Sequence, residues 1–165
     1  PNGCGKSTLL KVLAGQLEPR AGRCKVVAQR VYLDQRLATL DPQRSVLDQL
    51  RSANHSACEG ELRMWLAQLG LDAQRVTLPS GALSGGERLK AALACVLYAE
   101  PPAQLLLLDE PSNHLDLTSM QALEAMLRGY AGALLVVSHD EVFLEGLALT
   151  HRLEASELGW VLGFW

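Results

Sequence analysis

The segment NGCGKST, residues 2–8, has the residue types that a phosphate-binding loop needs. Glycine adopts unusual backbone dihedrals and permits the close approach that lets several N–H groups point at one phosphate, and we assign this role to Gly3 and Gly5. The helix expected to follow adds the positive end of its dipole. The loop is therefore predicted to bind nucleotide phosphates through Asn2, Gly3, Cys4, Gly5, Lys6, Ser7 and Thr8.

Two side chains of this loop carry specific chemistry. Lys6 supplies a positive charge for the β- and γ-phosphates, and the Ser7 hydroxyl is a predicted ligand of Mg²⁺. The complete pattern is G-x-x-x-x-G-K-[ST], and its first glycine would precede Pro1. We therefore expect that the chain begins inside the motif and is a truncated form of a longer protein.

Two acids follow a short apolar run, LLLLDEP. Such a run fits a fully buried parallel strand, and open α/β sheets bind ligands at the carboxyl ends of their strands. Asp109 is predicted to hold Mg²⁺, and Glu110 to act as the general base that polarises the attacking water. A solvated strand end without function is the alternative for this pair taken alone.

The segment LSGGE, residues 83–87, combines a helix start with two glycines. Ser84 and Glu87 have the spacing of a capping box, which explains part of the pattern structurally. Glycine in a first helical turn is less favourable than alanine by roughly 1 kcal/mol. Bare N–H groups that contact a phosphate would justify Gly85 and Gly86, so Ser84, Gly85, Gly86 and Glu87 are predicted to bind nucleotide.

Two further polar residues end predicted strands. His139, after ALLVV, is placed to contact a γ-phosphate or the attacking water. Gln35, after VYLD, is predicted to orient water and Mg²⁺. A single histidine is more often structural, and Ser138 with Glu141 resembles a further capping box. Both functional assignments therefore depend on the neighbouring motifs.

Hydrophobic spacing predicts elements that can position these residues. Helices are expected over about 5–17, within 41–71, over 87–98 and 118–127, and in a short segment near 140–147. Strands are expected within 24–35, over 104–109 and 133–137, with edge strands or a hairpin in 150–165. Capping boxes are expected at Ser45 and Ser56, and Gly70 is a predicted helix stop. Alternating strands and helices predict an α/β fold with a mostly parallel sheet, flanked by helices.

Composition excludes several classes. Apolar residues make up 48% of the 165 residues, so a globular domain is expected, and the net charge of −3 does not indicate nucleic-acid binding. Apolar runs are too short to cross a bilayer, so no membrane insertion is predicted. The four cysteines lack C-x-x-C spacing and are expected to be reduced thiols of a cytoplasmic protein.

In this order, the motifs resemble the nucleotide-binding domain of an ATP-binding-cassette (ABC) ATPase. NGCGKST resembles its Walker A motif, LLLLDE its Walker B motif and LSGGE its signature, while Gln35 and His139 match the Q-loop and switch residues. SNHLD, residues 112–116, resembles the D-loop. LSGGE in place of LSGGQ, the NHLD run and a short helical region are similar to the ABC-F branch, whose members are soluble, usually carry two cassettes and are associated with ribosomes.

The resemblance implies one P-loop NTPase-type domain over residues 1–165, with a short α-helical subdomain at about 41–83. It also implies that two cassettes dock head to tail around ATP and Mg²⁺, the second lying in the same parent chain or a dimer. One cassette would present Lys6, Ser7, Asp109, Gln35, Glu110 and His139, and the other Ser84, Gly85 and Gly86. Asp116 would lie at the seam between them.

The expected activity is hydrolysis of ATP to ADP and phosphate on ribosomes or in translation. An ATPase subunit of a membrane transporter is one alternative, and an inactive fragment that binds nucleotide weakly is another. Because the strands that would precede Pro1 anchor the loop in such a fold, residues 1–165 alone are expected to bind ATP poorly and hydrolyse it negligibly. The parent protein is expected to be active.

Overall fold

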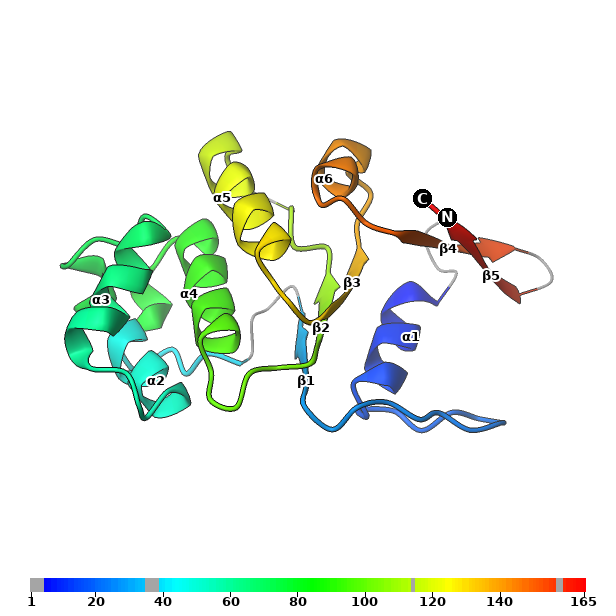
Figure 1. Cartoon of the computed structure of the whole chain (residues 1–165), viewed down its shortest axis with the longest axis horizontal. Coiled ribbons are helices and arrows are strands. Elements are labelled where there is room, and N and C mark those ends of the chain that lie inside the picture. The colour runs from blue at the N-terminus through cyan, green and yellow to red at the C-terminus, as the bar shows by residue number, and fades with distance from the viewer. Residues whose placement is uncertain (1–4, 35–38, 114, 157–158) are drawn as a thin grey trace.

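The computed structural model of the chain describes residues 5–34, 39–113, 115–156 and 159–165. Its helices and strands follow one another as labelled in Figure 1. They are α1 (Lys6–Leu13), β1 (Arg30–Leu33), α2 (Val46–Ala53), α3 (Glu59–Gln68), α4 (Gly85–Leu97), β2 (Leu105–Asp109), α5 (Leu117–Arg128), β3 (Ala133–Val137), α6 (Glu141–Gly146), β4 (His151–Ser156) and β5 (Gly159–Phe164), with short 3₁₀ turns at Arg75–Thr77 and Ser80–Ala82.

The sheet that carries the predicted site has the order β1-β2-β3, and both pairings are parallel. Leu33 pairs with Leu108, and Asp109 pairs with Val137, so the carboxyl ends of all three strands meet at one edge. The mostly parallel sheet of the sequence analysis is confirmed. The C-terminal tail forms an antiparallel hairpin of β4 and β5, which settles the choice between a hairpin and edge strands.

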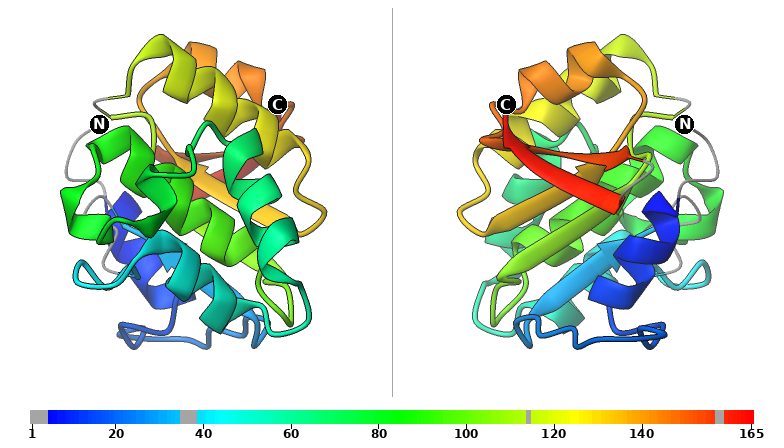
Figure 2. Two further views of the ribbon diagram at one scale, coloured as in Figure 1. Left: turned by 90° about the vertical axis from the view of Figure 1, so that its left-hand side faces the viewer. Right: turned by 90° about the vertical axis from the view of Figure 1, so that its right-hand side faces the viewer.

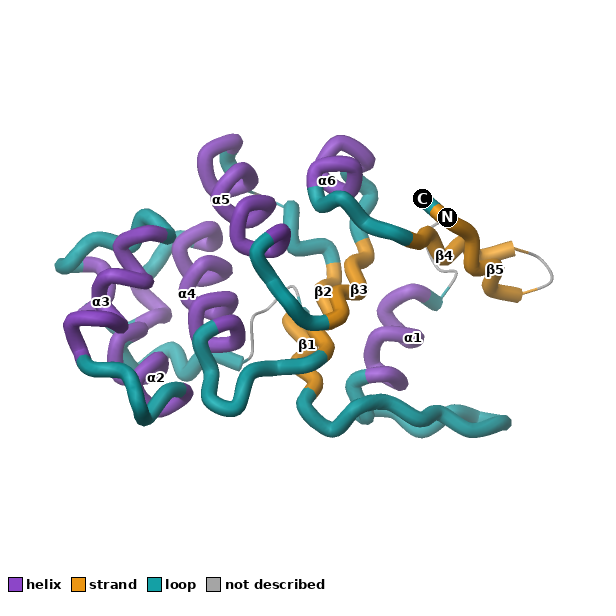
Figure 3. The backbone as a smooth tube through the Cα atoms, in the orientation of Figure 1, coloured by secondary structure: helices purple, strands orange, loops and turns teal. Residues whose placement is uncertain are grey.

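Helices cover both faces of this sheet (Figures 1 and 2). α1 and the hairpin lie on one side, whereas α4 and α5 lie on the other, with α2 and α3 packed outside α4 (Figure 3). Strand β2 is central, and Leu106, Leu107 and Leu108 are completely buried. Residues 91–94 of α4 are all buried, and three of them are alanines. The helix is therefore closely packed around most of its circumference.

Two strands differ from the prediction. Among the described residues 24–34, only Arg30–Leu33 form a strand, and residues 24–29 approach the sheet as a loop without ladder pairing. The apolar run of β3 predicts a buried strand, but Ala133 is exposed and the remaining residues are half-buried. Strand β3 pairs with β2 on one side only within the described sheet, and its residues 134–137 line the cavity described below.

Helix caps test the local predictions. Ser45 caps α2 as expected: its hydroxyl accepts from the Asp48 N–H at 3.1 Å. The cap of α3 was misplaced, because Cys58 with Glu61 forms the capping box, not Ser56 with Glu59. The Asn54 side chain holds the Ser56 amide and hydroxyl in a turn, and Glu59 pairs with arginines instead.

The other helix ends give one more correction. Gly70, with φ of 73°, follows α3 and confirms the predicted stop. Helix α4 begins at Gly85, two residues before the predicted start, and ends at Leu97. Asp140 caps α6 by accepting from the Phe143 N–H at 3.0 Å, so the predicted Ser138–Glu141 capping box is wrong. The Ser138 hydroxyl instead accepts from the Asp140 N–H and contacts Ser112.

Two compositional expectations can be compared with the described residues. Cys24, Cys58 and Cys95 are free thiols in the structure, as expected, while Cys4 lies outside the described residues. No helix within the described ranges is long and apolar enough to cross a membrane.

Helix α6 offers a test of the core. Phe143 is 1% exposed and Val142 beside it is 76% exposed. Phe143→Ala is expected to lower the free energy of unfolding by about 3–5 kcal/mol, because it removes buried apolar contacts and leaves a cavity. Val142→Ala should change it by less than about 0.5 kcal/mol. Urea denaturation measures both, and comparable losses in the two variants would contradict this packing.

Candidate functional site

The predicted site lies where β2 and β3 end. Asp109 is the last residue of β2 and Glu110 follows it, while Ser138 and His139 follow β3. Because the strands are parallel neighbours, both loops reach the same edge, and the Glu110 N–H donates to the Val137 carbonyl at 2.8 Å. The structure therefore brings the predicted acid pair and the predicted histidine together.

Glu110 is held from two sides by His139. The His139 Nε2 lies 3.3 Å from Glu110 Oε1, and the His139 backbone N–H donates to Glu110 Oε2 at 3.3 Å. The Glu110 side chain is mostly buried, whereas that of His139 is 57% exposed. Glu110 adopts φ of 52°, a left-handed conformation that is unfavourable for a residue with a Cβ. Such strain gathers at functional sites, and the Glu110 carboxylate at this position contacts His139.

Lys6, the first residue of α1, joins this cluster from the face of the sheet that α1 covers. Its Nζ lies 3.1 Å from His139 Nε2, which places the start of α1 beside the loops after β2 and β3. A neutral imidazole nitrogen accepts or donates, but does not do both. Lys6 and Glu110 therefore compete for the same nitrogen, and a ligand that draws Lys6 away would free His139 to donate to Glu110.

The beginning of α1 suits an anion. Gly5 is its N-cap, with φ of 88° and ψ of 15°, and no side chain in the described residues caps this helix end. A Cβ on Gly5 would meet nothing within 4 Å, so its backbone conformation, not crowding, requires glycine. Ser7 and Thr8 are exposed in the first turn. Asn2, Gly3, Cys4 and Gln35 lie outside the described residues.

Asp109 has a partner that the sequence analysis missed. The Tyr32 hydroxyl, from β1, donates to Asp109 Oδ2 at 3.1 Å, and Asp109 is 7% exposed. Burial, followed by the charge and hydrogen bond of Asp109, raises the pKa of Tyr32 well above its usual range, so the phenol remains a donor. The sequence shows Tyr32 in the predicted strand that leads to Gln35. Its contact with Asp109, however, follows only from the pairing of β1 with β2.

Ser84 and Glu87 form the predicted capping box at the start of α4. The Ser84 N–H donates to Glu87 Oε2 at 2.8 Å, and the Ser84 hydroxyl accepts from the Glu87 N–H at 3.3 Å. The Ser84 N–H, followed by its hydroxyl, lowers the pKa of Glu87, and Arg75 lies 3.4 Å away. The Glu87 carboxylate is thus already engaged within the chain.

Gly85 and Gly86 have different surroundings. A Cβ on Gly85 would meet nothing within 4 Å, whereas one on Gly86 would lie 3.0 Å from Ser119 Oγ and 3.5 Å from Leu115. Gly86 therefore lets α4 approach α5 closely, a reason for glycine that the sequence analysis did not consider. Asp116 caps α5 by accepting from the Ser119 N–H at 2.7 Å, and that N–H lowers the pKa of Asp116.

The predicted site residues thus form two groups within one chain. Lys6, Glu110 and His139 are in contact, and Asp109 adjoins them, whereas Ser84, Gly85 and Gly86 lie at the start of α4, where Gly86 contacts α5. Helices α1 and α4 cover opposite faces of the sheet (Figure 1). In the described part of the chain, no hydrogen bond or ion pair joins Ser84 or Glu87 to Lys6, Glu110 or His139.

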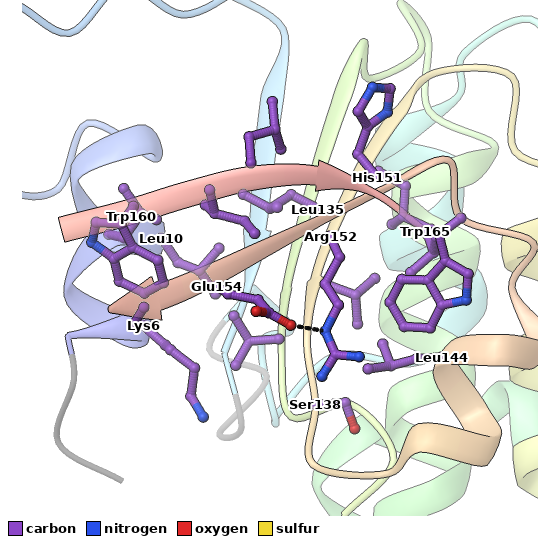
Figure 4. Close-up of a pocket in the computed structure, with 18 of the residues that line it drawn as sticks. Lys6, Leu10, Leu135, Ser138, Leu144, His151, Arg152, Glu154, Trp160 and Trp165 are labelled. Carbon is purple, nitrogen blue, oxygen red and sulfur yellow. Dashed lines mark ion pairs between the residues drawn. The ribbon is translucent and has the colours of Figure 1, made fainter. Parts of the chain in front are cut away.

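A cavity of about 660 Å³ adjoins the first group. It opens to the surface and is lined by α1, β3 and the hairpin, and Figure 4 shows Lys6 and Trp160 at one end and His151 and Trp165 at the other. Its walls are mainly apolar, and Arg152 with Glu154 forms an ion pair of 2.9 Å at its side. The sequence analysis did not predict this cavity, which three distant segments create.

The available donors fit Mg²⁺. The Ser7 hydroxyl and the Asp109 carboxylate are hard oxygen ligands, which Mg²⁺ prefers. No group of three or more histidine, cysteine, aspartate or glutamate side chains suited to a metal occurs among the described residues. So sparse a set suits an ion that shares its coordination with substrate phosphates and water rather than one held in a protein cage.

Comparison with known proteins shows a family of ATP-binding proteins to which the chain is similar. A family model described as ABC transporter matches residues 1–113. The ATP-binding protein Uup-like of Haemophilus influenzae is 38% identical over 154 residues, covering 90% of this chain and 33% of the relative. The putative ATP-binding protein YdiF of Bacillus subtilis is 42% identical over 158 residues, covering 94% and 24%. ABC transporter F family member 3 of Arabidopsis thaliana is 38% identical over 149 residues, covering 88% and 21%. The chain thus spans a third or less of the length of these relatives.

Solved structures share the fold. An inward-facing putative metal-chelate type ABC transporter matches with a TM-score of 0.75 and 27% identity, covering 99% of this chain and 70% of that one. The complex of archaeal ribosomal stalk protein aP1 with the archaeal ribosome recycling factor aABCE1 matches with a TM-score of 0.76 and 29% identity, covering 93% and 30%. These likenesses confirm the α/β, P-loop NTPase-type fold.

Glu87 provides a test of pH dependence. Its pKa is lowered in the folded chain from the ordinary value of 4.5, so its charged form stabilises the fold. This contribution is complete above the unfolded-state pKa and is lost as pH falls through the folded-state pKa. Glu87→Gln cannot titrate, so its deficit in unfolding free energy should shrink as pH falls below about 4.5. A deficit that is constant between pH 7 and pH 3 in urea titrations would contradict this.

The two glycines of α4 are matched controls for each other. Gly85→Ala is expected to raise the free energy of unfolding by up to ~1 kcal/mol, because alanine favours helix and has room there. Gly86→Ala is expected to lower it, because its methyl group would crowd Ser119. Equal shifts of the unfolding midpoint in the two variants would show that the contact with α5 is unimportant.

Proposed function

Because the chain belongs to the ABC family of ATP-binding cassettes, and to its ABC-F type, we propose that it hydrolyses ATP to ADP and phosphate as one cassette of an ABC-F protein. The observation that carries this proposal is the contact of Lys6, His139 and Glu110 beside Asp109. Cation, imidazole and carboxylate meet there at the end of a parallel sheet, where ligands of such folds bind.

Each residue of the cluster has a role in the proposed reaction. The exposed N–H groups at the start of α1, with Lys6, would hold the phosphates. Glu110 would accept a proton from the water whose oxygen attacks the γ-phosphorus, while the bond from phosphorus to the β–γ bridging oxygen breaks and ADP leaves. His139 holds the Glu110 carboxylate through its backbone N–H. Mg²⁺, bound by Ser7 and Asp109, would offset phosphate charge, and Gln35 would orient it and the water.

A second cassette would complete the site. Ser84 and Gly85 are exposed, and α4 lies across the sheet from Lys6. The start of α4 would therefore bind the phosphate of the ATP held by a partner cassette. Asp116 would lie at the seam between the two cassettes. Residues of about 41–83 would form the helical subdomain that precedes the start of α4. A site divided between two cassettes makes hydrolysis depend on their closure, because positioning supplies most of the catalysis.

The ribosome is the proposed target. Several relatives are ABC-F proteins or Uup-type ATP-binding proteins, and one structural neighbour is a ribosome recycling factor solved with a ribosomal stalk protein. A cytoplasmic location fits this proposal. The similarity to a metal-chelate type transporter supports the competing role of a transporter subunit. Co-sedimentation of the complete gene product with ribosomes is expected, and its recovery with membranes alone would favour the transporter role.

Glu110→Gln tests the reaction. In the complete gene product, ATP hydrolysis should fall about 10²–10⁴-fold, because the general base is lost, while ATP binding persists and a closed pair of cassettes accumulates. Glu145→Gln, on the exposed surface of α6, is the matched control and should leave turnover unchanged. Hydrolysis within about twofold of the unchanged protein would exclude Glu110 as the base.

A further inference from the structure

Strand β1 places one phenol against the carboxylate of Asp109. Tyr32 pairs in register with Leu107, two residues before Asp109, so its side chain lies beside the end of β2. Its hydroxyl donates to Asp109 Oδ2 at 3.1 Å. We propose that Tyr32 is a positioning residue that reserves one oxygen of Asp109, so that this carboxylate binds a cation through its other oxygen and favours Mg²⁺ over Ca²⁺.

The first step of the argument concerns the freedom of the carboxylate. Asp109 is buried at the end of a central strand, and Asp109 itself pairs with Val137 of β3. The backbone of Asp109 is thus held by β3, and the hydrogen bond from Tyr32 of β1 restrains the rotation of its side chain. A hydroxyl that donates to a carboxylate makes a charge-assisted hydrogen bond, which is stronger than one between neutral groups.

The second step concerns coordination. Mg²⁺ requires near-octahedral geometry and binds carboxylates through single oxygens, keeping several waters, whereas Ca²⁺ accepts more ligands and often both oxygens of one carboxylate. With Oδ2 engaged by Tyr32, Asp109 presents Oδ1 to a cation. Removal of the phenol hydroxyl would release Oδ2 for bidentate binding, which suits the larger ion.

This inference rests on the proposed function, in which Asp109 is a ligand of Mg²⁺. The test therefore contains a variant for each claim. Tyr32→Phe keeps the ring and loses the hydroxyl, and Asp109→Ala removes the carboxylate. Tyr130→Phe is the matched control, because the Tyr130 hydroxyl donates at 2.8 Å to the Ala103 carbonyl, at the other end of the sheet.

The measurement is metal binding without turnover. The complete gene product is loaded with a non-hydrolysable ATP analogue, Mn²⁺ binding is followed by electron paramagnetic resonance, and Mg²⁺ and Ca²⁺ are added as competitors. Mutation of a residue that hydrogen-bonds to a metal ligand typically changes metal affinity 10–100-fold, so Tyr32→Phe is expected to weaken the binding of Mn²⁺ and Mg²⁺ at least about tenfold. The affinity for Ca²⁺ should fall less, so the preference for Mg²⁺ over Ca²⁺ should decrease.

The outcomes separate the two claims. If Asp109→Ala weakens Mn²⁺ binding but Tyr32→Phe leaves both the affinity and the Mg²⁺ preference as in Tyr130→Phe, the positioning role is refuted and the proposed function stands. If Asp109→Ala changes nothing, the metal assignment fails and the inference fails with it. A loss of stability in Tyr32→Phe with an unchanged ratio of Mg²⁺ to Ca²⁺ affinity would show a merely structural tyrosine and also overturn the proposal.

A second measurement uses the complete gene product without substitutions, labelled biosynthetically with fluorotyrosine. The fluorine NMR signals of Tyr32 and Tyr130 are assigned from the Tyr32→Phe and Tyr130→Phe variants. Addition of Mg²⁺ with the ATP analogue should shift the Tyr32 signal more than the Tyr130 signal. Equal responses of these two signals would contradict contact between the phenol and a metal-binding carboxylate.

Discussion

Parallel pairing of β2 with both of its neighbours is the constraint on which the rest of the site depends. β2 is buried between β1 and β3, and parallel strands end at the same edge of a sheet. Tyr32, Asp109 and His139 come from three segments that are far apart in the sequence, yet this pairing places their side chains within one group. An apolar strand that ends in two acids can only present them at that edge while its leucines remain buried.

Contact across the sheet adds the cation. α1 packs on the face opposite α4, and its first residue reaches His139 over the end of the strands. The resulting chain of contacts, from Lys6 to His139 to Glu110, links the predicted phosphate loop with the predicted base. Because Lys6 and Glu110 approach the same imidazole nitrogen, a ligand that engages Lys6 would alter the contact between His139 and Glu110.

The start of α4 is held by contacts within its own chain. Its Ser84–Glu87 capping box is local, but Gly86 is in close contact with Ser119, whose N–H is in turn held by Asp116. The starts of α4 and α5 are therefore in contact at Gly86, whereas Gly85 has open space around it. A movement of either helix start would carry the other with it, since close-packed contacts transmit displacement.

Residue types and local spacing alone predicted the helix that begins after Gly5, the two acids at the end of β2, the α4 capping box and the alternation of strands and helices, because each depends on neighbours within a few residues. Local patterns gave the wrong cap where another nearby side chain made a competing hydrogen bond. The Asn54 side chain accepts from the Ser56 N–H, and the Asp140 side chain caps α6. Tertiary structure alone decided the strand order, the Tyr32–Asp109 bond, the crowding at Gly86 and the cavity beside β3. Those features join residues tens of positions apart, which local spacing cannot bring into relation.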